Sequence, residues 1–470
     1  MRTPGSRVVT GLLPAVAVTL AAWGMAAGGC LRHDQREVTG PRIHWSVRID
    51  EPSHGIAHVE GRLSAYENSG VSSIALDFLD LATEPSRLAA PSARTAAGGP
   101  VPVQSVPTRP GRFTLELAGR TGTVTVQYTI DPTYFPPGSQ ARGPTDARSR
   151  IAPELAIVRT TSLLPQVDLQ DLEESVRFVL PEGWVAVTPW PARGDTLLLG
   201  SHADPTVDYL ALGPFRLAEI AAGDRVIRIA MASGGVPLSL GEIASIFHAA
   251  VEVVGIPPPA EGNILTVAVV PTAFMQGGAA GRHSIVQSAS PEVIAHEMFH
   301  WWNHSGLTTA EATWFREGLT NYYGIQLARA SGAWTDEGAA DCLADLEAEM
   351  RYLERDGASS LAEASRAYRY DPALRRLVYG KGTLFSLLLE RQLSGAGRTL
   401  DEVTRALLAH GYQNLGNQDI RRVVSEVYNG LVDTTFDTYV SGVAELPALG
   451  LGVPMGRSGC ARFLPEREPD

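Results

Sequence analysis

The segment His296-Glu297-Met298-Phe299-His300 sets two imidazoles four residues apart, with a carboxylate between them. Residues i and i+4 of an α-helix lie on the same face, so His296 and His300 can ligate one metal ion. Glu297 projects beside that face, where it can take a proton from an attacking water and pass it to a leaving amine. Such a pentapeptide also arises by chance, and two histidines do not complete a catalytic zinc site. The prediction therefore depends on a third ligand.

The residues around this segment predict a helix. Ser290 is a suitable N-cap, Pro291 suits the first helical position, and Glu292 complements the positive end of the helix. We therefore predict one helix from Pro291 to about Asn303. His304 continues the four-residue series, but the helix is expected to end there, so we interpret His304 as a residue on the surface or behind the ligands.

A second motif supplies the third ligand. The run from Trp314 to Gly318 places Glu317 on a predicted helix that also carries a rival carboxylate, Glu311. A helix with Trp-x-x-Glu-Gly after His-Glu-x-x-His resembles the gluzincin metallopeptidases, and this resemblance favours Glu317. The likeness is greater to the glycyl aminopeptidase family, which carries His-Glu-x-Phe-His-x-Trp-Asn and Glu-Gly-x-Thr-x-Tyr-Tyr.

The resemblance implies a peptidase that binds one Zn²⁺ through His296, His300 and Glu317, with Glu297 as general base and acid. Asn321 follows Glu317 by one helical turn, so it either accepts a hydrogen bond from a ligand histidine or faces water.

A third motif, Val378 to Phe385, resembles the Tyr-Glu-Lys-Gly segment of aminopeptidase-N-like enzymes. The resemblance implies that the Tyr379 hydroxyl hydrogen-bonds the tetrahedral intermediate, where negative charge develops. The alternative is a tyrosine that only packs between helices. The same segment contains Lys381, the single lysine of the chain.

One segment departs from the family pattern. Related aminopeptidases carry a glutamate before the zinc helix that binds the free α-amine of the substrate, but residues 277–284 read Gly-Gly-Ala-Ala-Gly-Arg-His-Ser. Aligned on His283, Arg282 takes the place of that glutamate and would repel an ammonium group. Aminopeptidase specificity is therefore in doubt, and endopeptidase activity or a preference for acidic or blocked termini is the alternative. We take Gly277, Gly278, Arg282 and His283 as candidate substrate-binding residues.

Composition bounds the class of protein. The chain has 470 residues, 44% of them hydrophobic, and a formal net charge of −12. No basic stripe indicates nucleic-acid binding, so the expected partner is a peptide or protein substrate.

The N-terminus resembles a bacterial lipoprotein signal. Arg2 and Arg7 precede an apolar stretch that ends in small residues before Cys30. We expect a signal peptide over residues 1–29, lipidation of Cys30, and an enzyme anchored to the membrane of the bacterial cell envelope, facing the periplasm or exterior. An uncleaved transmembrane anchor or an ordinary secretory signal is the alternative. In such a compartment, Cys342 and Cys460 are available to pair.

The remaining pattern predicts an α+β fold. After a linker over residues 30–41, two-residue alternation predicts a β-rich, sandwich-like domain over 42–222. Residues 223–445 read as a thermolysin-like catalytic domain, a small mixed sheet followed by helices. The tail, 446–470, reads as irregular, and no length remains for the C-terminal PDZ domain of some relatives. The predicted strands are 44–49, 58–63, 113–117 and 124–128, then 226–230 and 264–270 in the catalytic domain, where a helix is predicted over 240–254.

Two other classes of protein remain open at this point. One is a non-catalytic envelope lipoprotein that contains zinc and binds peptides or other ligands. The other is a hydrolase of a different bond, as in an epoxide hydrolase among gluzincin relatives. The presence of Glu297 and Tyr379 favours the peptidase, because a purely structural zinc site needs neither residue.

Overall fold

A computed structural model describes most of the chain. The signal peptide predicted for residues 1–29, Cys30, His304 and Cys460 lie outside the described residues. Cys342 is disulfide-bonded, and its partner cysteine also lies outside them. In the described part of the chain, no helix combines the length and apolarity needed to cross a bilayer. The described ranges are 40–81, 84–135, 147–200, 208–222, 225–233, 238–258, 264–303, 307–356, 359–409, 414–430 and 432–451.

The N-terminal region is a β-sandwich, as predicted. Along its central strands alternate residues point inward, so Ile43, Trp45 and Val47 are buried while their neighbours are not. Its larger sheet has the order β14-β15-β12-β1-β2-β8-β4-β5. The strands are β1 (Arg42–Arg48), β2 (Ala57–Ser64), β4 (Ser92–Thr95), β5 (Pro100–Val101), β8 (Val124–Ile130), β12 (Glu173–Val179), β14 (Ala192–Arg193) and β15 (Thr196–Gly200).

Two smaller sheets complete this region. One has the order β11-β3-β7-β6 and the other β13-β16-β10-β9. Their strands are β3 (Ser73–Asp77), β6 (Val103–Ser105), β7 (Arg112–Glu116), β9 (Arg150–Ile151), β10 (Ala156–Arg159), β11 (Gln166–Val167), β13 (Val185–Val187) and β16 (Tyr209–Gly213). Short helices join the strands: α1 (Thr160–Leu163) and 3₁₀ turns at Pro52–His54, Tyr66–Ser69, Leu79–Leu81 and Pro85–Arg87.

The β10 and β16 strands connect the two halves of the protein. On one face, Val158 and Leu210 join the core of the sandwich. On the other face, Ile157 and Ala211 pack against Val286 and other residues of the catalytic sheet. The N-terminal region thus shares a continuous apolar layer with the sheet that carries the site.

The catalytic sheet has five strands in the order β17-β18-β19-β21-β20. The strands β18, β19 and β21 run parallel, and an antiparallel strand closes each edge. The predicted domain boundary at 222/223 cuts this sheet, because β17 pairs with β18 along its whole length. Alternation identifies a strand but not the sheet that it joins. The strands are β17 (Phe215–Ala222), β18 (Arg225–Ala232), β19 (Ile264–Val270), β20 (Gly278–Ala280) and β21 (Ser284–Ser288).

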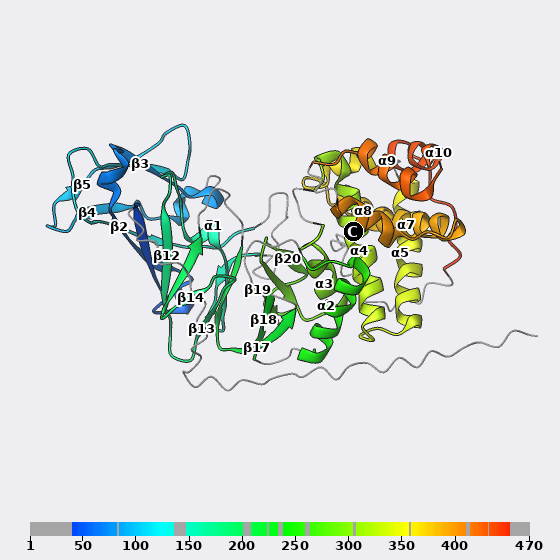
Figure 1. The fold of residues 1–470 in the computed structure, drawn as a ribbon, viewed down its shortest axis with the longest axis horizontal. Coiled ribbons are helices and arrows are strands. Elements are labelled where there is room, and N and C mark those ends of the chain that lie inside the picture. The colour runs from blue at the N-terminus through cyan, green and yellow to red at the C-terminus, as the bar shows by residue number, and fades with distance from the viewer. Residues whose placement is uncertain are drawn as a thin grey trace, which may run out of the picture.

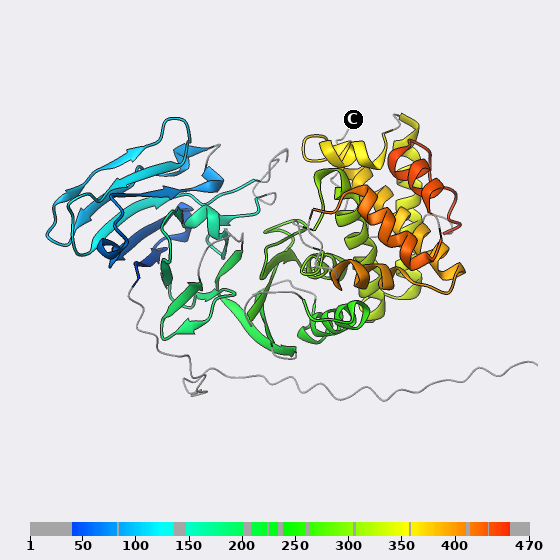
Figure 2. The same cartoon turned by 45° about the horizontal axis from the view of Figure 1, so that its top comes forward.

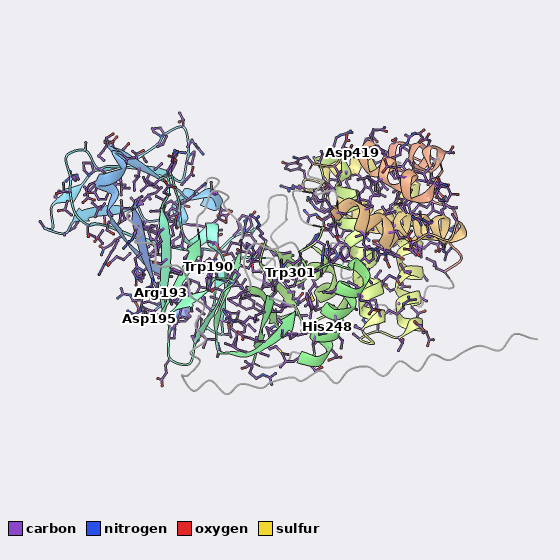
Figure 3. The ribbon with its side chains drawn as sticks, in the orientation of Figure 1. Trp190, Arg193, Asp195, His248, Trp301 and Asp419 are labelled. Carbon is purple, nitrogen blue, oxygen red and sulfur yellow. The ribbon has the colours of Figure 1, made fainter. Side chains whose placement is uncertain are left out.

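Helices cover one face of this sheet and extend away from the sandwich (Figures 1 and 2). The predicted helix over 240–254 is present as α2, with a capping box at Ser239 and Glu242. Figure 3 shows Trp301 between the sheet and the helices that follow it in the chain. The helices are α2 (Leu240–Val254), α3 (Pro291–Phe299), α4 (Thr313–Ala330), α5 (Asp336–Asp356), α6 (Leu361–Ala367), α7 (Pro372–Gly395), α8 (Leu400–Ala409), α9 (Asn417–Tyr428), α10 (Asp433–Phe436), a 3₁₀ turn at Ala310–Ala312 and a π-helical turn at Asp437–Ser441.

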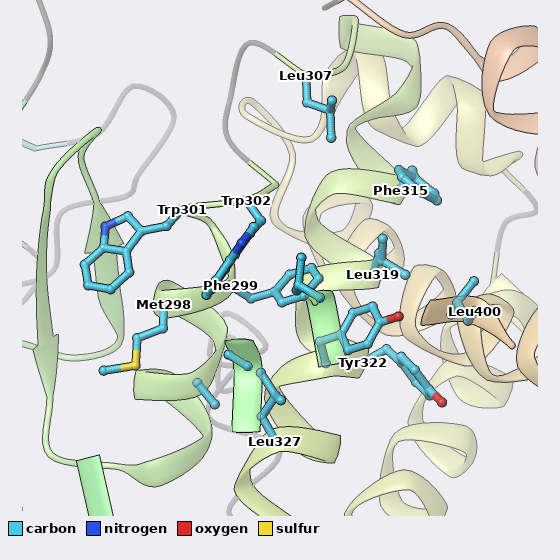
Figure 4. Close-up of a cluster of buried hydrophobic side chains, with 14 of the residues drawn as sticks. Met298, Phe299, Trp301, Trp302, Leu307, Phe315, Leu319, Tyr322, Leu327 and Leu400 are labelled. Atoms are coloured by element: carbon cyan, nitrogen blue, oxygen red, sulfur yellow. The ribbon is translucent and has the colours of Figure 1, made fainter. Parts of the chain in front are cut away.

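The helix predicted to run to Asn303 ends earlier, at Phe299. The backbone N–H of Trp301 donates to Met298 and that of Trp302 donates to Phe299, so the last turn tightens to the three-residue spacing of a 3₁₀ helix. Trp301 and Trp302 lie against Phe247 of α2, whereas Phe299 at the end of the helix stacks on Tyr323 of α4 with 4.3 Å between ring centroids. Figure 4 shows Trp301 directed away from Phe315 and Leu319 of α4. The helix thus ends early where these aromatic rings become buried. Local sequence signals for a helix do not include such packing.

The helix α4 lies against both α3 and α7 at unusually short range. A Cβ on Gly318 would stand 2.5 Å from Cα of Gly382 in α7. A Cβ on Gly324, on another side of α4, would stand 3.2 Å from Cβ of His296 in α3. The two backbones can approach at Gly318 only because neither residue there carries a side chain.

We expect Gly318→Ala to destabilise the protein by about 1–3 kcal/mol, because the added methyl forces α4 and α7 apart. Gly395→Ala is the matched control, since no atom lies within 4 Å of the added methyl. Urea unfolding of both variants measures the difference. Equal stability of the two variants would show that α4 and α7 do not depend on this contact.

Candidate metal centre and active site

Three ligand atoms from two helices converge at one point. His296 comes from α3, His300 from the residue that ends it, and Glu317 from α4. The Nε2 atoms of the two histidines are 3.2 Å apart, and Glu317 Oε2 is 3.4 Å from His300 Nε2 and 3.9 Å from His296 Nε2. Ligands bound tetrahedrally to zinc are separated by about 3.3 Å. In the described residues, these three form the one group able to hold a metal ion.

Hydrogen bonds orient both imidazoles. His300 Nδ1 lies 3.0 Å from the Asn303 carbonyl oxygen, which fixes Nδ1–H as the donor and leaves the Nε2 lone pair for a metal. Asn303 in turn donates through Nδ2 to the Arg316 carbonyl at 2.9 Å and to Thr320 Oγ1 at 3.0 Å. Asn303, in the turn after α3, thereby orients the ligand His300 and hydrogen-bonds α4.

Asn321 lies behind His296. It is 1% exposed, and its side chain acts to raise the pKa of the His296 imidazole. Of the two interpretations open from the sequence, the structure therefore favours a partner of a ligand histidine over a residue that faces water.

The two oxygens of Glu317 have different partners. Arg316 donates from Nε and from Nη2 to Oε1, each at 3.0 Å, and Oε2 is left facing the histidines. The Arg316 Nη2 group also donates to the Tyr368 hydroxyl at 3.2 Å. The rival carboxylate Glu311 is committed elsewhere, to Arg366 and to the backbone N–H of Asn417.

The electrostatics of His296 and Glu317 fit a cation, and the charge of Glu317 raises the pKa of His300 in spite of its burial. Burial and the neighbouring His300 lower the pKa of His296 to about 3, so its imidazole is neutral. Although burial alone would raise the pKa of Glu317, Arg316 and the histidines hold it well below its usual range. A neutral imidazole and an ionised carboxylate are the forms that ligate zinc, so the residues fit the metal.

Glu297 lies beside the metal ligands and against the edge strand. Burial raises the pKa of its carboxyl to about 7, while the charges of His300 and Arg148 act in the opposite direction. A Cβ on Gly278 would stand 2.4 Å from Cγ and 2.5 Å from Oε1 of Glu297. The Glu297 side chain thus occupies space that a side chain on the first residue of β20 would fill.

Tyr379 reaches the same site from α7. Its ring stacks on the His296 ring with 6.0 Å between centroids, and its hydroxyl hydrogen-bonds Glu317, whose charge adds to burial in raising the tyrosine pKa far above 10. Lys381, two residues further along α7 and fully buried, instead donates from Nζ to the Ala444 carbonyl at 2.9 Å.

The predicted substrate-binding segment forms a hairpin at the sheet edge. Gly277, with φ of 67°, turns the chain into β20, and Gly278 and Ala280 share the face that packs toward the helices. Arg282 lies in the turn beyond the end of β20. His283 is held by Asp208, which accepts from its backbone N–H at 2.8 Å and lies 3.0 Å from its Nδ1.

Several residues near the site have no signal in the sequence. Asp208 and Tyr209 come from β16 or its start, and Arg148 comes from just before β9. Burial raises the pKa of Tyr209 to about 12, with Glu297 adding to the rise and Arg148 opposing it. These contacts join segments far apart in the chain, and a single sequence contains no local pattern that predicts them.

Comparison with known proteins agrees with this geometry. Residues 263–439 match the peptidase family M1 domain. An aminopeptidase N family protein from Idiomarina loihiensis has a similar fold, with a TM-score of 0.70 and 18% identity over 87% of this chain and 77% of that one. An M1 zinc metallopeptidase from Deinococcus radiodurans has a TM-score of 0.56 and 20% identity, over 87% and 94% of the two chains. A variant of an M1 zinc metallopeptidase from that organism, bound to Tyr-Ser-Ala, has a TM-score of 0.57 and 19% identity, over 89% and 96%. No curated protein matches the sequence.

The fold and the metal centre define a gluzincin zinc metallopeptidase. More particularly, residues 263–439, which contain the three ligands, match the peptidase family M1 domain, and the fold is similar to that of an aminopeptidase N family protein.

We expect Gly278→Ala to lower kcat/KM for peptide hydrolysis by about tenfold or more, because the methyl displaces the Glu297 carboxylate from its position. The zinc content should stay at one per chain, since no ligand contacts Gly278. Gly241→Ala in α2, whose added methyl has its nearest neighbour at 3.8 Å, is the control. Hydrolysis of a fluorogenic peptide and metal analysis check both variants, and undiminished turnover in Gly278→Ala would contradict this account of the contact.

Proposed function

We propose that this zinc metallopeptidase cleaves extended peptides laid along β20 and does not select for a free N-terminal amine. The observation that carries the proposal is the convergence of a His₂Glu metal centre, Glu297 and Tyr379 beside an edge strand whose site-facing residues, Gly278 and Ala280, carry no charge.

The edge strand supports binding of an extended chain. β20 ends the sheet, and no described strand pairs with its outer side. A peptide added there forms backbone hydrogen bonds that do not depend on its sequence. The peptide backbone would then run past Glu297, which Gly278 adjoins.

Bound by His296, His300 and Glu317, zinc supplies Lewis acidity toward a carbonyl oxygen and makes a water molecule more acidic. Glu297 takes the proton of the attacking water and later delivers it to the leaving amine. Both transfers need one carboxylate within hydrogen-bond reach of both groups, which is why its position against Gly278 matters.

Tyr379 is proposed to stabilise the developing oxyanion. Its hydroxyl lies close enough to hydrogen-bond Glu317, and the stacking on His296 fixes the direction of the ring. Its high pKa keeps it a neutral donor, so it adds a hydrogen bond where negative charge appears. Arg316 contributes indirectly, because its hydrogen bonds hold Glu317 in place.

The charges near β20 are the reason to propose that the enzyme does not require a free N-terminal amine on its substrate. A free ammonium group needs a carboxylate partner, yet the described residues on the site-facing side of the strand are glycine and alanine. The cation Arg148 lies at the start of the strand, and Arg282 lies in the turn beyond its end. Two positive charges near β20 favour the binding of internal, acidic or acylated substrate residues over a residue with a free amine.

We expect zinc-loaded protein to cleave N-acetylated fluorogenic peptides at least as well as matched free-amine peptides. Glu297→Gln should lose nearly all turnover, because an amide cannot accept the proton, while it retains zinc. Metal analysis of the variant separates loss of the base from loss of the metal.

Each outcome distinguishes a different account. Cleavage of free-amine peptides alone would contradict our proposal and indicate an aminopeptidase that uses another group for the amine. Binding of peptides without cleavage of either kind would instead favour a non-catalytic peptide-binding protein. Full activity of Glu297→Gln would remove Glu297 from its role.

A further inference from the structure

Arg148 extends from the N-terminal region to the segment that leads into β20. Its Nη1 donates to the Gln276 carbonyl at 2.5 Å, and its own backbone N–H donates to the Tyr134 carbonyl at 2.9 Å. The backbone of Arg148 is therefore held within the N-terminal region, and its guanidinium is held by the backbone of the segment before β20.

This position is close to the reacting groups. The residue after Gln276 is Gly277, and a Cβ there would stand 3.6 Å from Arg148 Nη2. The next residue, Gly278, is the one that adjoins the Glu297 carboxylate. Arg148 and Glu297 thus flank consecutive residues of one segment, and the arginine charge acts on the pKa of Glu297.

Arg148 differs from the neighbouring arginines in its partners. Among the described carboxylates, none forms a salt bridge with it, whereas Arg159 in the same region pairs with Asp80 at 2.9 Å. Arg150 differs again, because it stacks over the Phe274 ring at 4.0 Å and donates to the Phe274 carbonyl. A guanidinium presents several donors in a plane that matches a carboxylate, and the described hydrogen bond uses one terminal nitrogen.

We propose that Arg148 binds a carboxylate of the peptide substrate and makes this enzyme selective for peptides that carry one near the scissile bond. The inference rests on the proposed binding of peptide along β20. The carboxylate comes either from the C-terminus of a short peptide or from an aspartate or glutamate side chain. Arg282 lies past the far end of β20, so Arg148 is the arginine that adjoins the Glu297 end of the strand.

Four acetylated peptides of one sequence test the proposal and separate the two sources. They combine a C-terminal acid or amide with an internal Asp or Asn, and kcat/KM is measured for each. We expect the wild type to prefer one carboxylate over its neutral counterpart by at least about tenfold, the value of a charge-assisted hydrogen bond. Preference for the acid terminus identifies a short-peptide enzyme, and preference for Asp identifies side-chain recognition.

Variants assign that preference to the residue. Arg148→Gln should bring the ratio close to one, and Arg148→Lys should restore part of it because the charge remains. Arg150→Gln is the matched control, since it removes a neighbouring arginine-to-carbonyl hydrogen bond and should keep the wild-type ratio. A wild-type ratio near one, or an equal loss for all four peptides in Arg148→Gln, would overturn the proposal.

A binding measurement keeps this test independent of catalysis. Zinc-loaded Glu297→Gln protein is titrated with fluorescent forms of the four peptides, with and without Arg148→Gln. The same ratio should appear in Kd and disappear in the double variant. If the wild type shows no turnover, the proposed peptidase function fails but the proposed role of Arg148 does not. Equal Kd values for all four peptides would contradict the proposed binding of a carboxylate by Arg148.

Discussion

The close approach of α4 to its two neighbouring helices is the constraint on which the site depends. Glycines at positions 318 and 382 let the backbones of α4 and α7 touch, and Gly324 lets α4 lie against α3 at His296. Glu317 precedes the first of these contacts and Tyr379 lies one turn before the second. A side chain at the crossing would separate the third ligand from the tyrosine and from the histidines.

Hydrogen bonds add direction to this packing. Asn303 holds His300 through its carbonyl and α4 through its amide, so one residue fixes a ligand and the spacing of the helix that carries another. Arg316 occupies one oxygen of Glu317 and leaves the other for the metal. The buried charges of the centre therefore have designated partners, which is the condition under which burying them is tolerated.

Much of the site is predictable from sequence because its signals are local. The spacing of His296 and His300 depends on one helix, and Glu317 and Tyr379 lie in short motifs. The strands with two-residue alternation and the helix α2 also follow from local pattern. The end of α3, the sheet that β17 joins, and the parts played by Arg148, Asp208 and Arg316 are not predictable in this way. They depend on contacts between distant segments, or on side-chain directions that residue spacing does not determine.

The most direct test of the account is zinc binding by Glu317→Gln compared with Glu311→Gln, measured by calorimetry on metal-free protein. Both glutamates precede or lie within α4, but only Glu317 faces the histidines. The account predicts one zinc per chain with unchanged affinity for Glu311→Gln, and a loss of more than about 100-fold for Glu317→Gln, beyond that of an outer-shell partner. Retention of full affinity by Glu317→Gln would contradict the metal centre described.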